Sequence, residues 1–196
     1  MILSNREIQK ALDEKRLIIT PEPSPREKVA DQPCPYNNSS VDLRLGTEIV
    51  WYKDSQPITI DLSRGNISAY LSANSEKRTI TTREPFLLHP HHFILAKTLE
   101  RVEFPIGSPD SISLAARVEG RSSFARCGVL VHFTAPTIHS GFKGTITLEI
   151  INLGKYPVQL YAEMYVCQLI VEEVKGIPFE NPSQFQNQSR PEGSRL

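Results

Sequence analysis

From Val41 onward, the chain alternates short apolar runs with residues that favour turns. The clearest run is Thr145–Asn152, in which Ile146, Leu148 and Ile150 alternate with two threonines and a glutamate. A period of two is typical of a strand with one buried face, because successive side chains point to opposite sides of a sheet. Many short strands at this spacing predict an all-β sandwich, jelly roll or barrel. We expect strands at residues 41–45, 48–52, 58–62, 86–88, 93–99, 111–118, 129–134, 145–152 and 164–172.

The first residues show a helical pattern instead. Ser4 and Glu7 match a capping box, in which Ser4 caps the amide of Glu7 and the Glu7 side chain reaches back. Apolar residues then recur at helical spacing from Ile8 to Leu12. These signals predict one short amphipathic helix, over residues 5–14.

Two polar segments flank the predicted strands. Residues 21–40 carry five prolines and form a long loop for a compact domain, so we expect this loop to be either mobile or held at an interface. Residues 181–196 are polar, and we expect them to stay disordered until something binds them. A length of 196 residues with 15 prolines fits a single domain with many turns over residues 1–196.

Composition narrows the class of protein. Lys+Arg and Asp+Glu both number 22, whereas a general nucleic-acid binder is expected to carry a basic excess. No apolar run approaches the length needed to span a bilayer, and the charged first residues lack the apolar centre of a signal peptide. Cys34, Cys127 and Cys167 are odd in number and widely spaced. We interpret them as reduced thiols of a cytoplasmic protein.

His89, His91 and His92 are the obvious candidates for a metal site. Two strand positions spaced by two share one face, but a metal site also needs a third ligand of known position. The segment around Pro90 is also typical of a turn between two strands, and we favour this interpretation. A zinc-dependent deaminase needs the motifs H-x-E and P-C-x-x-C, and the sequence contains neither. Phosphate-binding glycine loops and a G-x-S-x-G elbow are also absent from the sequence.

Two features carry candidate chemistry. Gly120–Arg126 places two guanidinium groups, two hydroxyls and several backbone amides in seven residues, which suits the binding of phosphate oxygens. Glu149 lies on the polar face of its predicted strand, where a cleft would make it a candidate general acid and base. Taken alone, the first feature fits a solvated surface turn slightly better than an anion site, and the second is more typical of a solvated carboxylate.

Residues 120–154, GRSSFARCGVLVHFTAPTIHSGFKGTITLEIINLG, resemble the core signature of the dCTP deaminases, members of the trimeric dUTPase superfamily. That signature runs from a GRSS-x-AR-x-G block, through T-A and a glycine turn, to a strand with LE-x-x-N. The resemblance continues in NNSSVDLRLG (37–46), LAKTLE (95–100), MYVCQL (164–169), the opening ILSNREI and the tail QFQNQ. It therefore covers most of the chain, with the blocks in family order.

This resemblance implies a distorted jelly roll or β-barrel of the dUTPase-like type with a short N-terminal helix. It also implies a homotrimer with nucleotide sites between subunits, and a mobile C-terminal lid at residues 181–196. The implied reaction is the zinc-independent, hydrolytic deamination of dCTP to dUTP and ammonia, which supplies dUMP for thymidylate synthesis. Magnesium would accompany the triphosphate without protein ligands, and dTTP is implied as a feedback inhibitor.

The resemblance also assigns roles to residues. Glu149 would be the catalytic carboxylate, and Arg126 would help to keep it charged. The guanidinium and hydroxyl groups of residues 121–126 would hold the triphosphate, the backbone of Ala135 would meet the pyrimidine edge, and Gln188 would reach the phosphates from the lid. The expected nucleotide-binding residues are Arg121, Ser122, Ser123, Phe124, Ala125, Arg126, Ala135, His139, Thr147, Leu148, Gln168 and Gln188.

The sequence departs from the family pattern at two positions. His139 stands where the glycine turn often carries Asp, a residue that serves the sugar 3′-hydroxyl and, in phosphate-cleaving relatives, the attacking water. Gln184 stands in place of a phosphate-binding Lys of the lid. His139 argues against dUTP hydrolysis. A dUTP or dCTP diphosphatase, alone or combined with deamination, and a catalytically silent nucleotide sensor are the alternatives.

Overall fold

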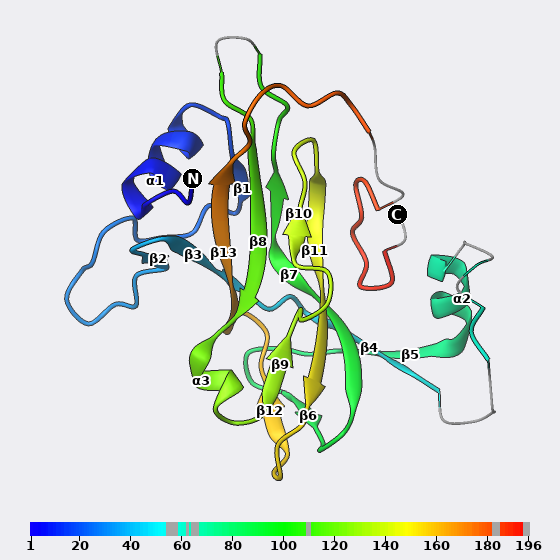
Figure 1. Cartoon of the computed structure of the whole chain (residues 1–196). Coiled ribbons are helices and arrows are strands. Elements are labelled where there is room, and N and C mark those ends of the chain that lie inside the picture. The colour runs from blue at the N-terminus through cyan, green and yellow to red at the C-terminus, as the bar shows by residue number, and fades with distance from the viewer. Residues whose placement is uncertain (54–58, 62, 64–66, 109–110, 182–184, 194–196) are drawn as a thin grey trace.

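The computed structural model describes residues 1–53, 59–61, 63, 67–108, 111–181 and 185–193, and it is built mainly of β-strands (Figure 1). The helices are α1 (Asn5–Asp13), α2 (Ile67–Asn74) and α3 (Ser122–Ala125). The strands are β1 (Ile18–Thr20), β2 (Tyr36–Asn37), β3 (Ser40–Arg44), β4 (Glu48–Tyr52), β5 (Ser75–Thr79), β6 (Phe86–Leu88), β7 (Phe93–Glu103), β8 (Leu114–Gly120), β9 (Val129–Val131), β10 (Thr137–Ile138), β11 (Lys143–Asn152), β12 (Val158–Leu160) and β13 (Tyr165–Glu173).

Two main sheets make up the domain. One has the strand order β5-β4-β7-β11-β9, with β1 also paired to β7, and the other has the order β10-β8-β13-β3-β2. A short third sheet pairs β12 with β6. The predicted all-β class with one short N-terminal helix ahead of the strands is confirmed. Since the sheets stay separate in the described part of the chain, the arrangement is a distorted jelly roll and not a closed barrel.

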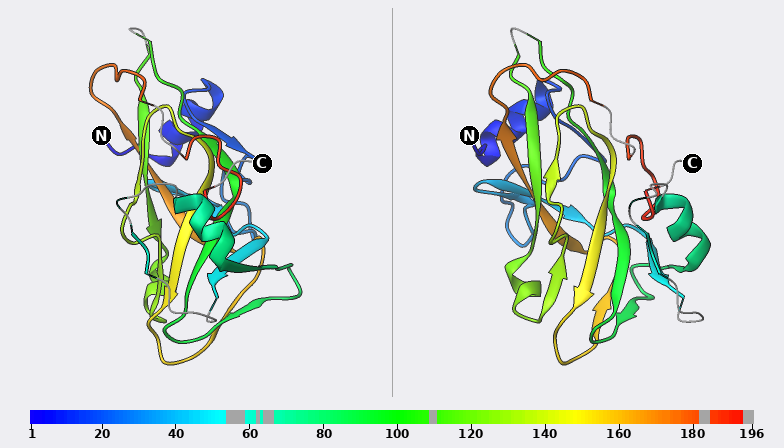
Figure 2. Two further views of the ribbon diagram at one scale, coloured as in Figure 1. Left: turned by 90° about the vertical axis from the view of Figure 1, so that its right-hand side faces the viewer. Right: turned by 45° about the vertical axis from the view of Figure 1, so that its right-hand side comes forward.

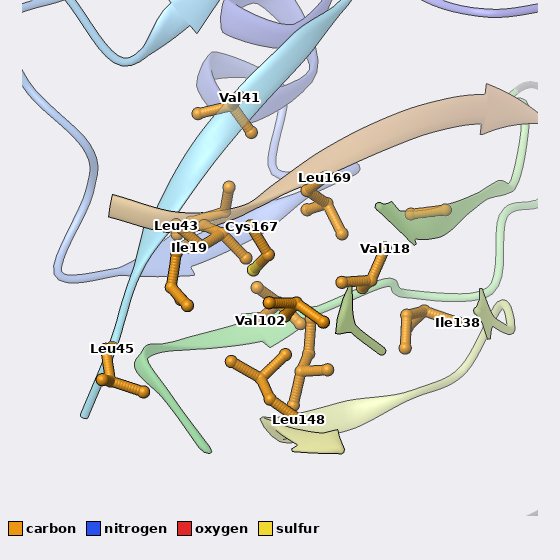
Figure 3. Close-up of a cluster of buried hydrophobic side chains, with 14 of the residues drawn as sticks. Ile19, Val41, Leu43, Leu45, Val102, Val118, Ile138, Leu148, Cys167 and Leu169 are labelled. Carbon is orange, nitrogen blue, oxygen red and sulfur yellow. The ribbon is translucent and has the colours of Figure 1, made fainter. Parts of the chain in front are cut away.

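The core fills the space between the two sheets (Figure 3). Val41 and Leu169 from one sheet and Val102 and Leu148 from the other are all completely buried. Along β11, buried and partly exposed residues alternate from Gly144 to Asn152, as the sequence pattern predicts. This alternation fixes Leu148 in the core and turns its neighbours on β11 outward, which positions the site described below.

The N-terminal segments pack as a unit. Helix α1 spans residues 5–13, and Ser4 Oγ accepts a hydrogen bond from the amide of Glu7 at 3.4 Å, which is the predicted cap. The proline-rich loop is held against this helix, because Arg26 pairs with Asp13 at 2.8 Å and the carbonyl of Arg26 accepts a hydrogen bond from Gln9 Nε2 at 2.6 Å. All three cysteines are free. Burial raises the pKa of the Cys167 thiol, which keeps that thiol protonated.

Several predicted boundaries are corrected. The strand predicted at 93–99 runs on to Glu103, and the one predicted at 111–118 begins only at Leu114. The strand predicted at 129–134 ends at Val131, because His132 adopts a positive φ of 54° and turns the chain. The strand predicted at 58–62 lies partly outside the described residues, and residues 59–61 are not a strand.

The structure also contains elements that we did not predict. Helices α2 and α3 and the short strands β1, β2, β5, β10 and β12 all fall in this class. Most span only two to five residues, too few for a hydrophobic period to appear in the sequence. Helix α2 has no basic residue in its last turn and no acidic residue in its first, so its sequence carries no charge signal for its ends.

The His89–His92 segment forms the predicted turn between β6 and β7. His91 adopts a φ of 64°, and its amide donates to the carbonyl of Asn152 at 2.6 Å. The His89 and His92 rings lie 5.6 Å apart. Among the residues that the structure describes, no three His, Cys, Asp or Glu side chains gather as metal ligands. No described helix is long and apolar enough to cross a membrane.

Candidate active site

A cavity of about 710 Å³ lies along the outward face of β11. Its walls come from β7, β10 and β11, from α2, and from the C-terminal segment, which Figure 2 shows beside α2. Five of the residues expected at a nucleotide site line this cavity, namely Ala135, His139, Thr147, Glu149 and Gln188. Its size suits a small-molecule ligand.

Glu149 is placed by the alternation along β11, which turns its side chain away from the core. Its Oε2 atom lies 2.7 Å from Nδ1 of His132, a residue that is only 7% exposed. The approach does not have the geometry of a hydrogen bond, so both buried atoms are without a hydrogen-bond partner among the described residues. Unsatisfied buried polar atoms mark a place where a ligand or a water molecule completes the bonding.

His132 is fixed from both sides. Its backbone amide donates to the carbonyl of Glu149 at 2.8 Å, which continues the pairing of β9 with β11. Its Nε2 atom lies 2.9 Å from the carbonyl of Ala135. A carbonyl only accepts, so Nε2 carries a proton, and Nδ1 is the atom that faces the Glu149 carboxylate. Glu149 thus has an oriented imidazole beside it.

Our sequence analysis did not select His132. The pairing of Val131 with Ile150 places the next residue, His132, opposite Glu149. That register joins segments far apart in the sequence and cannot be obtained from a local pattern. The strand break at His132 was also missed, because only the positive φ reveals it.

The C-terminal segment lies across the cavity and is held by hydrogen bonds to β11. The amide of Asn187 donates to the carbonyl of Lys143 at 2.7 Å, and the amide of Thr145 donates to the carbonyl of Gln188 at 3.2 Å. Further on, Thr147 Oγ1 donates to the carbonyl of Pro191 at 3.1 Å. The segment therefore runs parallel to β11, and its role as a lid stays a prediction.

Gln188 serves this docking. Its side chain is 6% exposed, and its Nε2 atom donates to the carbonyl of Thr145 at 2.7 Å. The glycine at position 144 leaves room for this close approach, because a Cβ added there would lie only 3.1 Å from the carbonyl oxygen of Gln188. Its predicted contact with phosphates stays a prediction, and Gln184 lies outside the described residues.

A second cluster of expected residues lies elsewhere, at the β8–α3 junction. The Arg121 guanidinium lies 3.4 Å from Asp42 Oδ2, donates to the carbonyl of Tyr165 at 3.3 Å, and stacks over the Tyr165 ring at 5.8 Å. Gln168 Nε2 donates to the other oxygen of Asp42 at 3.2 Å and to Ser40 Oγ at 3.4 Å. The nearly buried Asp42, which we did not single out from the sequence, holds both of these residues.

The rest of this arginine cluster, defined as Arg121–Arg126 with Gln168, points outward. Ser122, Ser123, Ala125 and Arg126 are exposed, and Phe124 packs partly against the core. None of the cluster lines the cavity, and Figure 1 shows α3 well away from the C-terminal segment. Within one chain, Arg126 is therefore not beside Glu149. Leu148 faces the core, which leaves only its backbone for a nucleotide.

Charge separates the two regions. The cavity is lined by Glu149, Glu180 and Glu192 and by no Lys or Arg among the described residues. Lys97 on the neighbouring strand is engaged by Glu48 at 2.8 Å and by the carbonyl of Ser189 at 2.5 Å. A polyphosphate would thus find its cationic partners at the arginine cluster and not in this cavity.

Comparison with known proteins identifies the family. Residues 2–174 match the dCTP deaminase-like family. The chain is 40% identical to the "dCTP deaminase, dUMP-forming" of Methanosphaera stadtmanae, over 100% of this chain and 93% of that protein. It is 40% identical to the "dCTP deaminase" of Natronomonas pharaonis, over 100% of this chain and 95% of that protein.

The fold agrees with this assignment. The structure is similar to that of the 2′-deoxycytidine 5′-triphosphate deaminase of Agrobacterium tumefaciens, with a TM-score of 0.59 at 17% identity. The match covers 87% of this chain and 47% of that chain. The similarity confirms the predicted jelly roll of the dUTPase-like type. The chain belongs to the dCTP deaminase-like family.

Proposed function

We propose that the protein deaminates dCTP by hydrolysis, with Glu149 as the group that moves protons. The observation that carries this proposal is the pairing of Glu149 with His132 inside the cavity, at 2.7 Å and with both atoms unsatisfied. The names of the relatives support the choice of substrate. An assay that resolves ammonia, dUTP, dUMP and pyrophosphate from dCTP tests it.

The chemistry needs one well-placed carboxylate. Water adds to C4 of cytosine while Glu149 accepts a proton from that water, and Glu149 then supplies a proton to the ring nitrogen N3. When the tetrahedral intermediate collapses, the proton of the new C4 hydroxyl passes through the same carboxylate to the amino group, which leaves as ammonia. His132 holds the Glu149 carboxylate in one orientation for both transfers.

We further propose that the site is completed by a second copy of the chain within a homotrimer. Within one chain, Glu149 lines a cavity with no Lys or Arg among the described residues, and the exposed Arg126 lies outside it. A triphosphate needs cationic partners, and the arginine cluster of a neighbouring copy would supply them. Sedimentation should show a trimer, and a monomer that turns over dCTP would contradict this proposal.

Magnesium would enter with the triphosphate. No cluster of three metal-binding side chains occurs in the described parts of the chain, so phosphate oxygens and water would supply most ligands of Mg²⁺, an ion that retains several waters in most sites. Removing magnesium should weaken dCTP binding, and chelating zinc should leave deamination unchanged. Loss of activity on removal of a stoichiometric zinc ion would contradict the zinc-independent reaction.

A second candidate product is dUMP. The name of the Methanosphaera stadtmanae relative favours it, because that protein is described as dUMP-forming. Against it stands His139, which lines the cavity where the family resemblance expects an Asp near the sugar. We propose dUTP as the product, destined for dUMP supply. Stoichiometric pyrophosphate release from dUTP would establish the second candidate instead.

A further inference from the structure

Glu192, in the docked C-terminal segment, is a carboxylate without a partner among the described residues. The residue is only 7% exposed, yet it lines the cavity that contains Glu149. No hydrogen bond or ion pair to its side chain occurs within the described parts of the chain. Its oxygens are not among the fully buried, unpaired atoms, so the carboxylate opens on the cavity, where a ligand that donates hydrogen bonds could pair with it.

The path of the segment brings Glu192 to the wall of the cavity that Glu149 also lines. Asn187 bonds to Lys143, Gln188 to Thr145 and Pro191 to Thr147, so the segment advances along β11 in the same direction as the strand. Glu192 directly follows Pro191, which is anchored to Thr147, and it lines the same cavity as the next outward residue of β11, Glu149.

A tight turn fixes this placement. The amide of Gly193 donates to the carbonyl of Arg190 at 2.9 Å, and Gly193 has a φ of 79°. A Cβ added at Gly193 would lie 2.7 Å from the Phe185 ring and 3.3 Å from Ser68 Oγ of α2. Because the turn is packed between these groups, Glu192 has little freedom to swing away from the cavity.

We infer that Glu192 is a specificity residue that selects a pyrimidine bearing an amino group at C4 over one bearing a carbonyl oxygen there. This inference rests on the proposed function, which puts C4 of the base beside Glu149. A carboxylate accepts hydrogen bonds and donates none, so it can bond to the amino group of cytosine. The same carboxylate opposes O4 of uracil or thymine, because both atoms are acceptors.

Direct binding tests this inference without interference from turnover. In Glu149→Gln, equilibrium dissociation constants for dCTP and dUTP give the preference between the two bases. Adding Glu192→Gln, which keeps the shape and removes the charge, should reduce that preference about tenfold, since a hydrogen bond to a charged group is lost. Most of the change should come from tighter dUTP binding, as the acceptor repulsion disappears.

Two further variants separate specificity from structure. Glu192→Asp keeps the charge on a shorter side chain and should retain part of the preference, whereas a purely structural role would not distinguish Asp from Gln in this way. Glu76→Gln changes a carboxylate on β5 that is exposed and outside the cavity lining, so it should leave both dissociation constants unchanged. An unchanged preference in the Glu192→Gln protein would overturn the inference.

Failure of the proposed function would give different results from failure of the role of Glu192 alone. If the unmodified protein releases no ammonia from dCTP, and the Glu149→Gln protein binds neither nucleotide, the proposed function itself is wrong. If the Glu149→Gln protein binds dCTP more tightly than dUTP and Glu192→Gln leaves that ratio intact, only the role of Glu192 is wrong.

Discussion

The cavity around Glu149 and the arginine cluster differ in how the chain builds them. The arginine cluster comes mostly from one continuous stretch, Arg121–Arg126, whereas the cavity combines β7, β10, β11, α2 and the C-terminal segment. Accordingly, the cluster can be recognised in the sequence as a local motif, whereas most of the cavity cannot. The chemistry of the two regions is also divided, since the cavity is acidic and the cluster is cationic.

The separation of the acidic cavity from the cationic cluster matters for the binding of a nucleotide. A triphosphate nucleotide carries its reacting base at one end and its charge at the other, so it needs both kinds of surface at once. One chain presents these surfaces apart from each other. We therefore propose that association of subunits completes the catalytic site.

The largest expected effect comes from removing the carboxylate on the acidic side. Glu149→Gln should retain dCTP binding and lose deamination by about 10³-fold or more, because one group handles every proton transfer. Ammonia release and equilibrium binding measure the two properties separately. If dCTP binding and catalysis fall together, Glu149 is a binding residue and not the proton carrier.

In the arginine cluster, Arg126→Ala should weaken catalysis about 100-fold, since it removes a guanidinium from the proposed polyphosphate site. Arg117→Ala is a matched control, because Arg117 is a partly exposed arginine of β8 that pairs with Glu172 at 2.7 Å. That variant should retain activity.

Mixing the two impaired proteins tests whether the cavity and the arginine cluster complete one site across a subunit boundary. Subunits of Glu149→Gln and of Arg126→Ala, unfolded and refolded together, should recover activity, because some sites would combine the intact cavity of one subunit with the intact cluster of another. Each protein refolded alone is the control. Without recovery in the mixture, the two regions do not complete each other across a subunit boundary.

A smaller effect is expected at His132. His132→Phe keeps a buried ring but removes both nitrogens, so it should lower kcat about 10- to 100-fold through misplacement of Glu149. His132→Asn should recover part of this loss, since Asn offers an amide near the position of Nδ1 and tolerates the positive φ of 54°. Equal losses in the two variants, together with a lowered melting temperature, would indicate a structural role alone.

The sequence predicted what depends on short-range patterns. The alternation along β11 placed Glu149 on the outward face, and the cap at Ser4 marked the first helix. It missed what depends on long-range register. His132 reaches Glu149 only through the pairing of β9 with β11, and Asp42 reaches Arg121 from a strand far away in the sequence.

The short elements escaped prediction for a different reason. Strand β10 has two residues, and its pairing with β8 reflects the surrounding sheet more than any preference of its own. Similarly, a polar sequence predicted disorder in the C-terminal segment, whereas the structure has residues 185–193 docked on β11. Composition predicts only whether a segment can fold by itself. It does not account for the hydrogen bonds that a neighbouring strand supplies.

The smallest predicted effect concerns this segment. Truncation after Asn181 should lower kcat/KM for dCTP about tenfold, because it opens the cavity and removes Gln188 and Glu192 from its wall. Stability and the proposed trimer should persist, since none of the described residues that are removed belongs to the hydrophobic core. Steady-state kinetics, thermal unfolding and sedimentation of the truncated protein measure these three properties.

Thr147→Val provides a milder version of the truncation, because it removes only the hydrogen bond from Thr147 Oγ1 to the carbonyl of Pro191 at 3.1 Å. Its effect should lie between those of the full-length and truncated proteins. Full activity after truncation would exclude the segment from the mechanism, and Glu149 would then act in a site open to solvent.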